Sequence, residues 1–72
     1  MPLEQHDSGI DTGKYAIVLR FSDGQTPFKD DALCKTWPRP FKSEVSGSNV
    51  VIYHEYERTD GTIGLFIVSG LV

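Results

Sequence analysis

Two apolar runs at the C-terminal end of the chain, NVVIYHEYER (residues 49–58) and IGLFIVSGLV (residues 63–72), flank the short segment TDGT (residues 59–62). Both runs are rich in β-branched and aromatic residues, which favour strands. Asp60-Gly61 between two strands is the strongest short-range hairpin signal, because a two-residue type I′ turn needs positive φ at both central residues. The sequence therefore predicts a long β-hairpin closed by Asp60 and Gly61.

A two-residue turn also determines which residues of the hairpin face each other. Thr59 would oppose Thr62, and further along the two strands Tyr56 would oppose Leu65. The core face predicted by this register consists of Val50, Ile52, Tyr56, Leu65 and Ile67. The other face then carries a second apolar cluster, made of Val51, Tyr53, Phe66 and Val68.

The run LFIV (residues 65–68) is apolar on both faces, whatever the register. Such a run is normally buried on both sides, so the sheet either closes into a small barrel or is covered by another molecule. Exposed apolar patches usually mark contact sites. We therefore predict that the second apolar cluster binds a protein target or a second copy of the chain, with about 1.5–3 kcal/mol gained per large side chain.

The remaining segments complete a small fold. Residues 1–13 contain few large aliphatic side chains and are predicted to be a flexible tail, which leaves residues 14–72 as a single domain. Apolar and polar residues alternate from Lys14 to Ser22, which is the pattern of a strand. Phe41 to Val45 is a further candidate strand.

A short helix is predicted between these two strands. Thr26 suits the N-cap, Pro27 suits the first helical position, and Pro38 ends the helical region. The predicted fold class is α+β, with a small, mainly antiparallel sheet of three to four strands, one short helix and the long C-terminal hairpin. The alternative is a small SH3-like or OB-like β-barrel.

Size and composition limit the protein class. A core of 72 residues rarely provides more than about 3–5 kcal/mol of net stability without a staple or a partner. The single cysteine, Cys34, excludes an intrachain disulfide and suits a reducing compartment. Neither a run of about 20 apolar residues nor the pattern of a signal peptide is present. The sequence predicts a cytoplasmic protein that does not bind a membrane.

Basic residues are concentrated in one part of the chain. Seven basic residues against ten acidic residues give a net charge of −3, which disfavours a dedicated nucleic-acid binder. Residues 32–43 nevertheless carry three basic residues and no acidic residue. The stretch KTWPRPFK (residues 35–42) interleaves these bases with aromatic rings, and tryptophan and arginine often dominate protein interfaces. We predict protein contacts by Trp37, Arg39 and Phe41.

The same stretch supports an alternative function, because basic residues with aromatic neighbours also bind single-stranded nucleic acid. The residues that would do so are Lys35, Trp37, Arg39, Phe41 and Lys42.

Residues with catalytic or metal-binding chemistry do not form a recognisable site. His54 lies on an apolar strand face, where histidine usually packs, and Cys34 suits a structural role. Glu55 and Glu57 are about 7 Å apart along a strand, but an exposed strand lacks a cleft that would shift their pKa values. The acidic tail around His6 lacks the ligand spacing of a zinc site. No catalytic, cofactor or metal site is predicted.

The sequence thus predicts a non-enzymatic protein-binding module. In its size, its single domain and its oversized hairpin, the chain resembles the small accessory and inhibitor proteins of phages and mobile elements. The resemblance implies a dimeric adaptor or inhibitor that occupies a surface of a host protein. A homodimer and one further, unidentified protein target are the expected partners, and single-stranded nucleic acid is the alternative.

Overall fold

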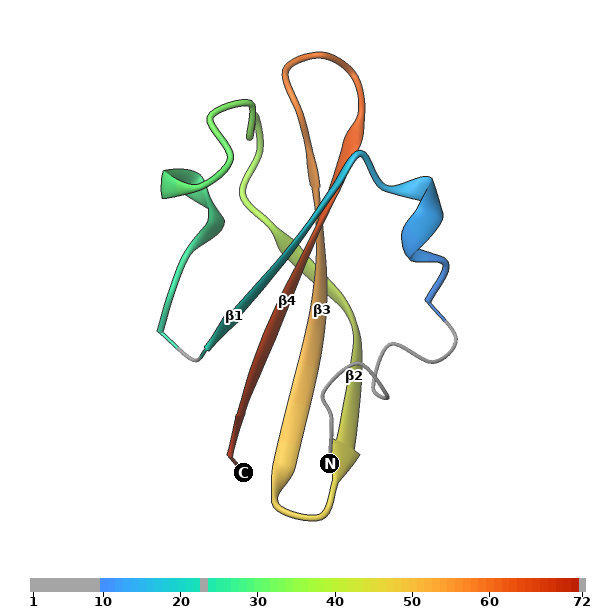
Figure 1. Ribbon diagram of the computed structural model, residues 1–72, viewed down its shortest axis with the longest axis vertical. Coiled ribbons are helices and arrows are strands. Elements are labelled where there is room, and N and C mark those ends of the chain that lie inside the picture. The colour runs from blue at the N-terminus through green and yellow to red at the C-terminus, as the bar shows by residue number, and fades with distance from the viewer. Residues whose placement is uncertain (1–9, 23, 72) are drawn as a thin grey trace.

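A computed structural model describes residues 10–22 and 24–71 of the chain, and these residues build one four-stranded sheet. The strand order across the sheet is β1-β4-β3-β2, so that the two strands of the C-terminal hairpin lie at its centre (Figure 1). The described elements, in chain order, are η2 (Thr12–Lys14), β1 (Ile17–Ser22), η3 (Pro27–Lys29), β2 (Arg39–Ser46), β3 (Asn49–Glu57) and β4 (Ile63–Leu71).

The sheet is mixed and open. β3 pairs antiparallel with both β2 and β4, whereas β1 pairs parallel with β4. β1 and β2 form the two edges of the sheet and do not pair with each other, so the described residues do not form the closed barrel of the alternative prediction. The prediction of a small, sheet-rich fold is confirmed, as is the candidate strand at Phe41 to Val45, which lies within β2.

The predicted short helix is wrong. Only a three-residue 3₁₀ turn, η3, forms there, although Thr26 does accept a hydrogen bond from the N–H of Phe28 at 3.3 Å. The following N–H groups bond elsewhere: that of Leu33 donates to the Asp31 carboxylate, and that of Cys34 donates to the Asp31 carbonyl. An α-helix would need these donors for carbonyls four residues earlier. The α+β class with a helix is therefore replaced by a sheet with 3₁₀ turns.

The loop of the C-terminal hairpin also differs from the prediction. It contains three residues, 59–61, because the N–H of Arg58 donates to the carbonyl of Thr62 at 2.9 Å. The N–H of Gly61 donates to the carbonyl of Arg58 at 3.0 Å, and Gly61 has a φ of 87°. Asp60 does not have positive φ, as a type I′ turn would require. A turn followed by a left-handed glycine is the usual three-residue solution.

This extra loop residue shifts the register of the hairpin by one. Tyr53 now pairs with Ile67 rather than with Val68, so the odd-numbered residues of β3 share a face with those of β4. A one-residue slip moves every side chain of one strand to the opposite face. The prediction that Leu65 and Ile67 lie in the core is confirmed, whereas Val50, Ile52 and Tyr56 lie on the other face.

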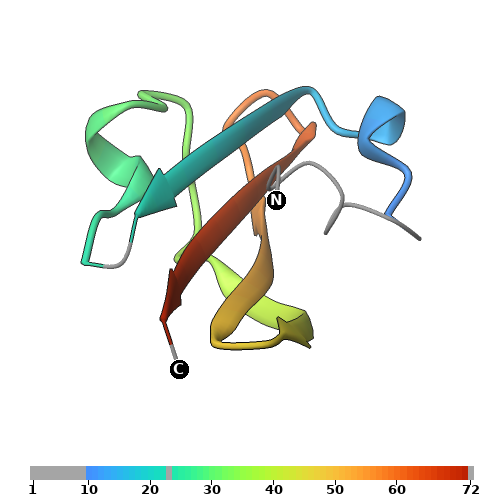
Figure 2. The same ribbon diagram turned by 60° about the horizontal axis from the view of Figure 1, so that its bottom comes forward.

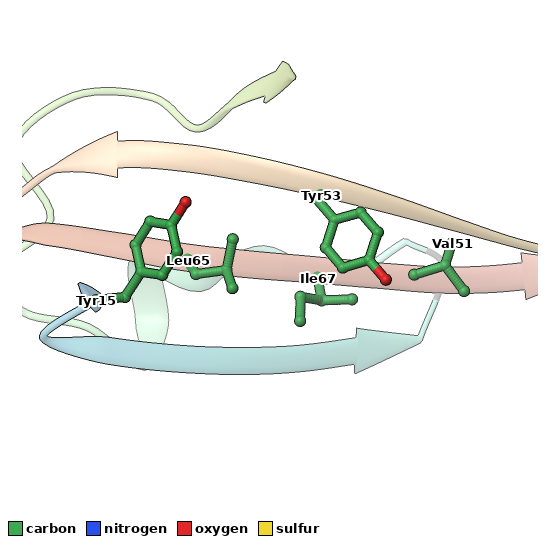
Figure 3. Close-up of a cluster of buried hydrophobic side chains, with 5 residues drawn as sticks. All are labelled: Tyr15, Val51, Tyr53, Leu65 and Ile67. Carbon is green, nitrogen blue, oxygen red and sulfur yellow. The ribbon is translucent and has the colours of Figure 1, made fainter. Parts of the chain in front are cut away.

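The main core is a row of side chains on one face of the sheet, called here the core face (Figure 3). Tyr53 and Leu65 are fully buried there, and the segment before β1 contributes Tyr15 and the partly buried Ile10. The buried members of this cluster are Tyr15, Val51, Tyr53, Leu65 and Ile67. Residues 1–9 of the predicted tail lie outside the described residues.

The other face, called here the opposite face, has a second buried region. Tyr56 and Phe66 are buried on it, and the ring of Tyr56 lies directly over Gly64. A Cβ atom at Gly64 would come within 2.1 Å of this ring, so the close approach of the two strands requires glycine there. The connection between β1 and β2 closes this part of the opposite face, where Asp31 accepts a hydrogen bond from the Tyr56 hydroxyl.

Candidate functional site

A buried carboxylate fastens the connection between β1 and β2 to the hairpin. Asp31 is 4% exposed and accepts hydrogen bonds from the Tyr56 hydroxyl at 2.6 Å and from Arg58 Nε at 3.0 Å. Burial by itself raises the pKa of Asp31, but the hydrogen bonds from Arg58, Tyr56 and the Leu33 N–H outweigh it and lower this pKa below its ordinary value. Asp31 is therefore a structural anion.

Backbone hydrogen bonds continue this attachment towards the basic and aromatic stretch. The Thr59 N–H donates to the Leu33 carbonyl at 2.7 Å, and the Lys35 N–H donates to the Glu57 carbonyl at 2.8 Å. The N–H of Glu57 in turn donates to the hydroxyl of Thr36 at 2.9 Å. These bonds hold the chain beside the hairpin up to the residue that precedes Trp37.

A β-bulge sets the direction of Phe41. The pairing of β2 with β3 shifts between Pro40 and Lys42, and Phe41, the residue between them, has no partner in the ladder. A bulge leaves one residue unpaired and redirects its side chain. The Phe41 ring lies against the ring of Tyr53, with 6.4 Å between centroids, yet it remains 45% exposed.

The bulge, the hairpin loop and the end of β3 enclose a groove of about 640 Å³. Its apolar part includes Phe41 and Ile63, and Ile63 is 46% exposed. The groove is lined by Arg39, Pro40, Phe41, Glu55, Tyr56, Glu57, Gly61 and Ile63. Its volume is within the usual range of ligand pockets, which is about 300–1,000 Å³.

The two acidic residues of the groove already have partners. Glu55 accepts a hydrogen bond from the Tyr15 hydroxyl at 2.5 Å, and Glu57 lies 3.9 Å from the ammonium of Lys35. Burial raises the pKa of Tyr15 above its ordinary value, and the bond to Glu55 adds to this effect. Tyr15 thus stays neutral and holds the Glu55 carboxylate in place.

Among the described residues, Trp37 is the most exposed aromatic side chain, at 72%. Its ring meets the ring of Phe28 edge to face, with centroids 4.2 Å apart. The turn that begins at Pro27 therefore supports one side of the indole and leaves most of its surface accessible.

Comparisons of the chain with protein-family models, with curated proteins and with solved structures find no match. Within the described ranges, no helix is long and apolar enough to cross a membrane.

The structure separates the predicted protein-binding residues into two groups. Trp37 and Phe41 are exposed, and Arg39 and Phe41 line the groove. Val51 and Tyr53 lie in the core. Phe66 is buried on the opposite face, and Val68 beside it is half-buried. Placing these four hairpin residues together on an outer face was wrong, because the three-residue loop shifts the register.

Ile63 was missed by the sequence analysis, because the predicted turn did not place it beside the basic and aromatic stretch. The bulge that redirects Phe41 leaves no specific sequence signal other than the neighbouring Pro40, since proline in a strand often marks an edge or a bulge. Phe41 thus enters the groove through the bulge in β2, and Ile63 enters it directly after the three-residue loop of the hairpin.

Groups with reactive chemistry are packed or partnered. The His54 ring lies over the ring of Phe66, with 5.1 Å between centroids, and its Nδ1 is 3.3 Å from the Phe66 carbonyl oxygen. Burial raises the pKa of the Cys34 thiol, and the Asp31 carboxylate raises it further, which disfavours the thiolate. The described residues contain no group of three side chains that would hold a metal ion.

Proposed function

We propose that the chain is a non-enzymatic protein-binding module that engages its target through the groove between the β2 bulge and the hairpin loop. The carrying observation is that two large apolar side chains, Phe41 and Ile63, are exposed in the lining of one concave surface. Trp37, two residues before the lining residue Arg39, is exposed as well. Large exposed apolar side chains that lie together are typical of contact sites. An adaptor or inhibitor acts in this way, by occupying a surface of its target.

The chemistry of the groove favours a peptide segment or loop with apolar side chains. Phe41 and Ile63 offer apolar contacts, while Arg39 offers a planar set of hydrogen-bond donors. Tryptophan and arginine are the residues most often found as interface hot spots. Because Phe41 rests on Tyr53 and Trp37 rests on Phe28, both rings lose little conformational freedom when a target binds.

Ion pairs weaken the case for single-stranded nucleic acid. Lys35 lies 3.9 Å from Glu57, and Lys42 lies 3.5 Å from Glu44. Binding of a phosphate backbone depends on basic side chains that neutralise phosphates, and here two of the three bases in the stretch have an acidic neighbour. A protein target is therefore the favoured partner.

Affinity capture from cells, followed by quantitative mass spectrometry, tests this function. The bait proteins are the wild type, Trp37→Ala, Phe41→Ala and, as a matched control, Val45→Ala, which removes an exposed apolar side chain that does not line the groove. Loss of a hot-spot side chain costs about 2 kcal/mol or more of binding free energy, or roughly a 30-fold loss of affinity. One target should be retained by the wild type and by Val45→Ala, and lost with both aromatic variants.

A target that binds all four proteins equally would contradict the assignment of the groove. A labelled single strand provides the second arm of the test. Salt-dependent retention of that strand, with loss in an Arg39→Ala, Lys42→Ala double variant, would favour the nucleic-acid function instead.

A further inference from the structure

The two edges of the sheet differ in how well they are protected against pairing. β2 contains Pro40, the bulge and the charged Lys42, and each of these features discourages a further strand. β1, in contrast, has the sequence IVLRFS (residues 17–22), which has neither proline nor glycine and carries a single charge. Its pairing with β4 runs without a shift from Ile17 to Ser22.

An edge strand of this kind is a template for another strand. Within the described residues, β1 pairs only with β4, so its outer side carries backbone groups that a further strand would meet. A side-chain hydrogen bond closes one end of this edge, because the N–H of Ser22 donates to Gln25 Oε1 at 3.1 Å. The available edge therefore runs from Ile17 to Phe21.

We propose that this edge pairs with the same edge of a second copy, so that two sheets join through antiparallel β1 strands. The inference is independent of the proposed function, because it uses the strand at the opposite edge of the sheet from the bulge. It places the homodimer contact at β1, rather than at the hairpin cluster that the sequence suggested.

The sequence of β1 is complementary to itself in one register. When Leu19 faces Leu19 of the second copy on the two-fold axis, Ile17 faces Phe21 and Val18 faces Arg20. An aliphatic–aromatic pair is among the favourable cross-strand pairs. Arg20 is kept apart from its equivalent, so this register avoids a pair of like charges on the axis.

The neighbouring registers are less favourable. A two-fold axis at Arg20 would place two guanidinium groups directly opposite each other, which is destabilising. An axis at Val18 would leave Phe21 beyond the paired segment, since its partner would then be Tyr15, which is buried in the core face and bonded to Glu55. The register centred on Leu19 is therefore the one that the proposal commits to.

The proposed register also continues the opposite face from one copy to the next. Phe21 packs edge to face on Phe66, with 5.1 Å between ring centroids. Ile17, Leu19 and Phe21 are half-buried on this face, so they have surface left to contact the same residues of a second copy. Figure 2 shows the connection that follows β1 turning back beside the C-terminal end of this strand, while β4 runs along the other side of β1.

A cysteine placed on the two-fold axis tests the contact. Residues directly opposite in an antiparallel pair have Cα atoms about 4.5–5.5 Å apart, a distance that a disulfide spans. In a Cys34→Ser background, Leu19→Cys should form a covalent dimer under mild oxidation. Ser22→Cys in the same background is the matched control, because two such residues would be about 20 Å apart by strand rise and should stay monomeric.

Sedimentation velocity of the unmodified chain provides an independent measurement. At about 100 µM a dimer with a Kd of about 1–10 µM is mostly assembled, so a dimer should dominate. Leu19→Lys brings two like charges together on the axis, so this variant should sediment as a monomer, and circular dichroism should show that the monomer is folded. Val45→Lys, on the other edge of the sheet, should remain dimeric. A monomeric wild type, or equal cross-linking at positions 19 and 22, would overturn the proposal.

Discussion

Asp31 shows how a single residue determines the conformation of a whole segment. Its carboxylate accepts hydrogen bonds from Tyr56 and Arg58 of the hairpin and from the backbone N–H of Leu33 in the connection between β1 and β2. The salt bridge between Arg58 and Asp31 is shielded, with their side chains 12% and 3% exposed. A shielded, hydrogen-bonded charge depends strongly on its partners, because removal of one leaves the other uncompensated.

We expect Asp31→Ala to lower the free energy of unfolding by about 3–5 kcal/mol. This loss is comparable to the whole stability of about 3–5 kcal/mol expected for a core of this size, so the variant should be largely unfolded at room temperature. The neighbouring Asp30→Ala removes an exposed carboxylate and serves as the control. Urea titrations followed by circular dichroism compare the two, and equal midpoints would contradict the role assigned to Asp31.

At the scale of elements, the hairpin loop decides the register of the sheet. The three-residue loop depends on one left-handed position, at Gly61, and on Asp60, which accepts hydrogen bonds from the N–H of Thr62 at 2.9 Å and from its hydroxyl. The hydrogen bond from the Thr62 hydroxyl contributes most to lowering the pKa of Asp60 below its ordinary value. The loop is thus held by its own side chains.

The positive φ of Gly61 leads to a prediction at this scale. Alanine at this position should cost about 1–2 kcal/mol of stability, because a Cβ atom is unfavourable in the left-handed region. Asparagine tolerates that region better and should cost less. Thermal unfolding of Gly61→Ala and Gly61→Asn measures the difference. Equal stability of both variants and the wild type would be inconsistent with the three-residue loop.

At the scale of the whole molecule, two buried tyrosines make stability depend on high pH. Tyr15 and Tyr56 donate to Glu55 and Asp31, and burial followed by these carboxylates raises the pKa of both hydroxyls above the ordinary value of about 10. Above about pH 10, the folded protein therefore keeps the protons of these two hydroxyls, whereas the unfolded chain loses them. Stability from this source is complete below pH 10 and declines as the pH rises above it.

Urea unfolding between about pH 8 and pH 11 should show this decline, since the unfolded tyrosines ionise near pH 10. Tyr56→Phe should be less stable at pH 8, because it removes a donor to Asp31, and its stability should fall less steeply above pH 10. A slope unchanged by the substitution would show that Tyr56 does not contribute to the pH dependence.

Much of the molecule was predictable because local patterns describe it. The hairpin, the first strand and the strand near Phe41 all follow from alternation and turn residues. Leu65 and Ile67 were correctly placed in the core, and the stretch from Trp37 to Phe41 was recognised as a candidate surface. These features depend on side chains that are near one another in sequence.

The features that the pattern could not supply depend on contacts between distant segments. Thr26 and Pro27 do suit the start of a helix, but Asp31 accepts hydrogen bonds from Tyr56 on β3 and from Arg58 just beyond it. These bonds favour a turn in place of the helix. The parallel pairing of β1 with β4 joins segments more than 40 residues apart and has no local signature.

The register illustrates the division most clearly. Both faces of the two C-terminal strands carry apolar residues, so burial alone does not favour one register over the next. The sequence was therefore compatible with two registers, each of which buries a different set of side chains in the core. The conformation of a single glycine, together with the bonds around Asp60, selected between them. Local chemistry thus determined which strands form, whereas long-range pairing decided which of their side chains are buried and which line the groove.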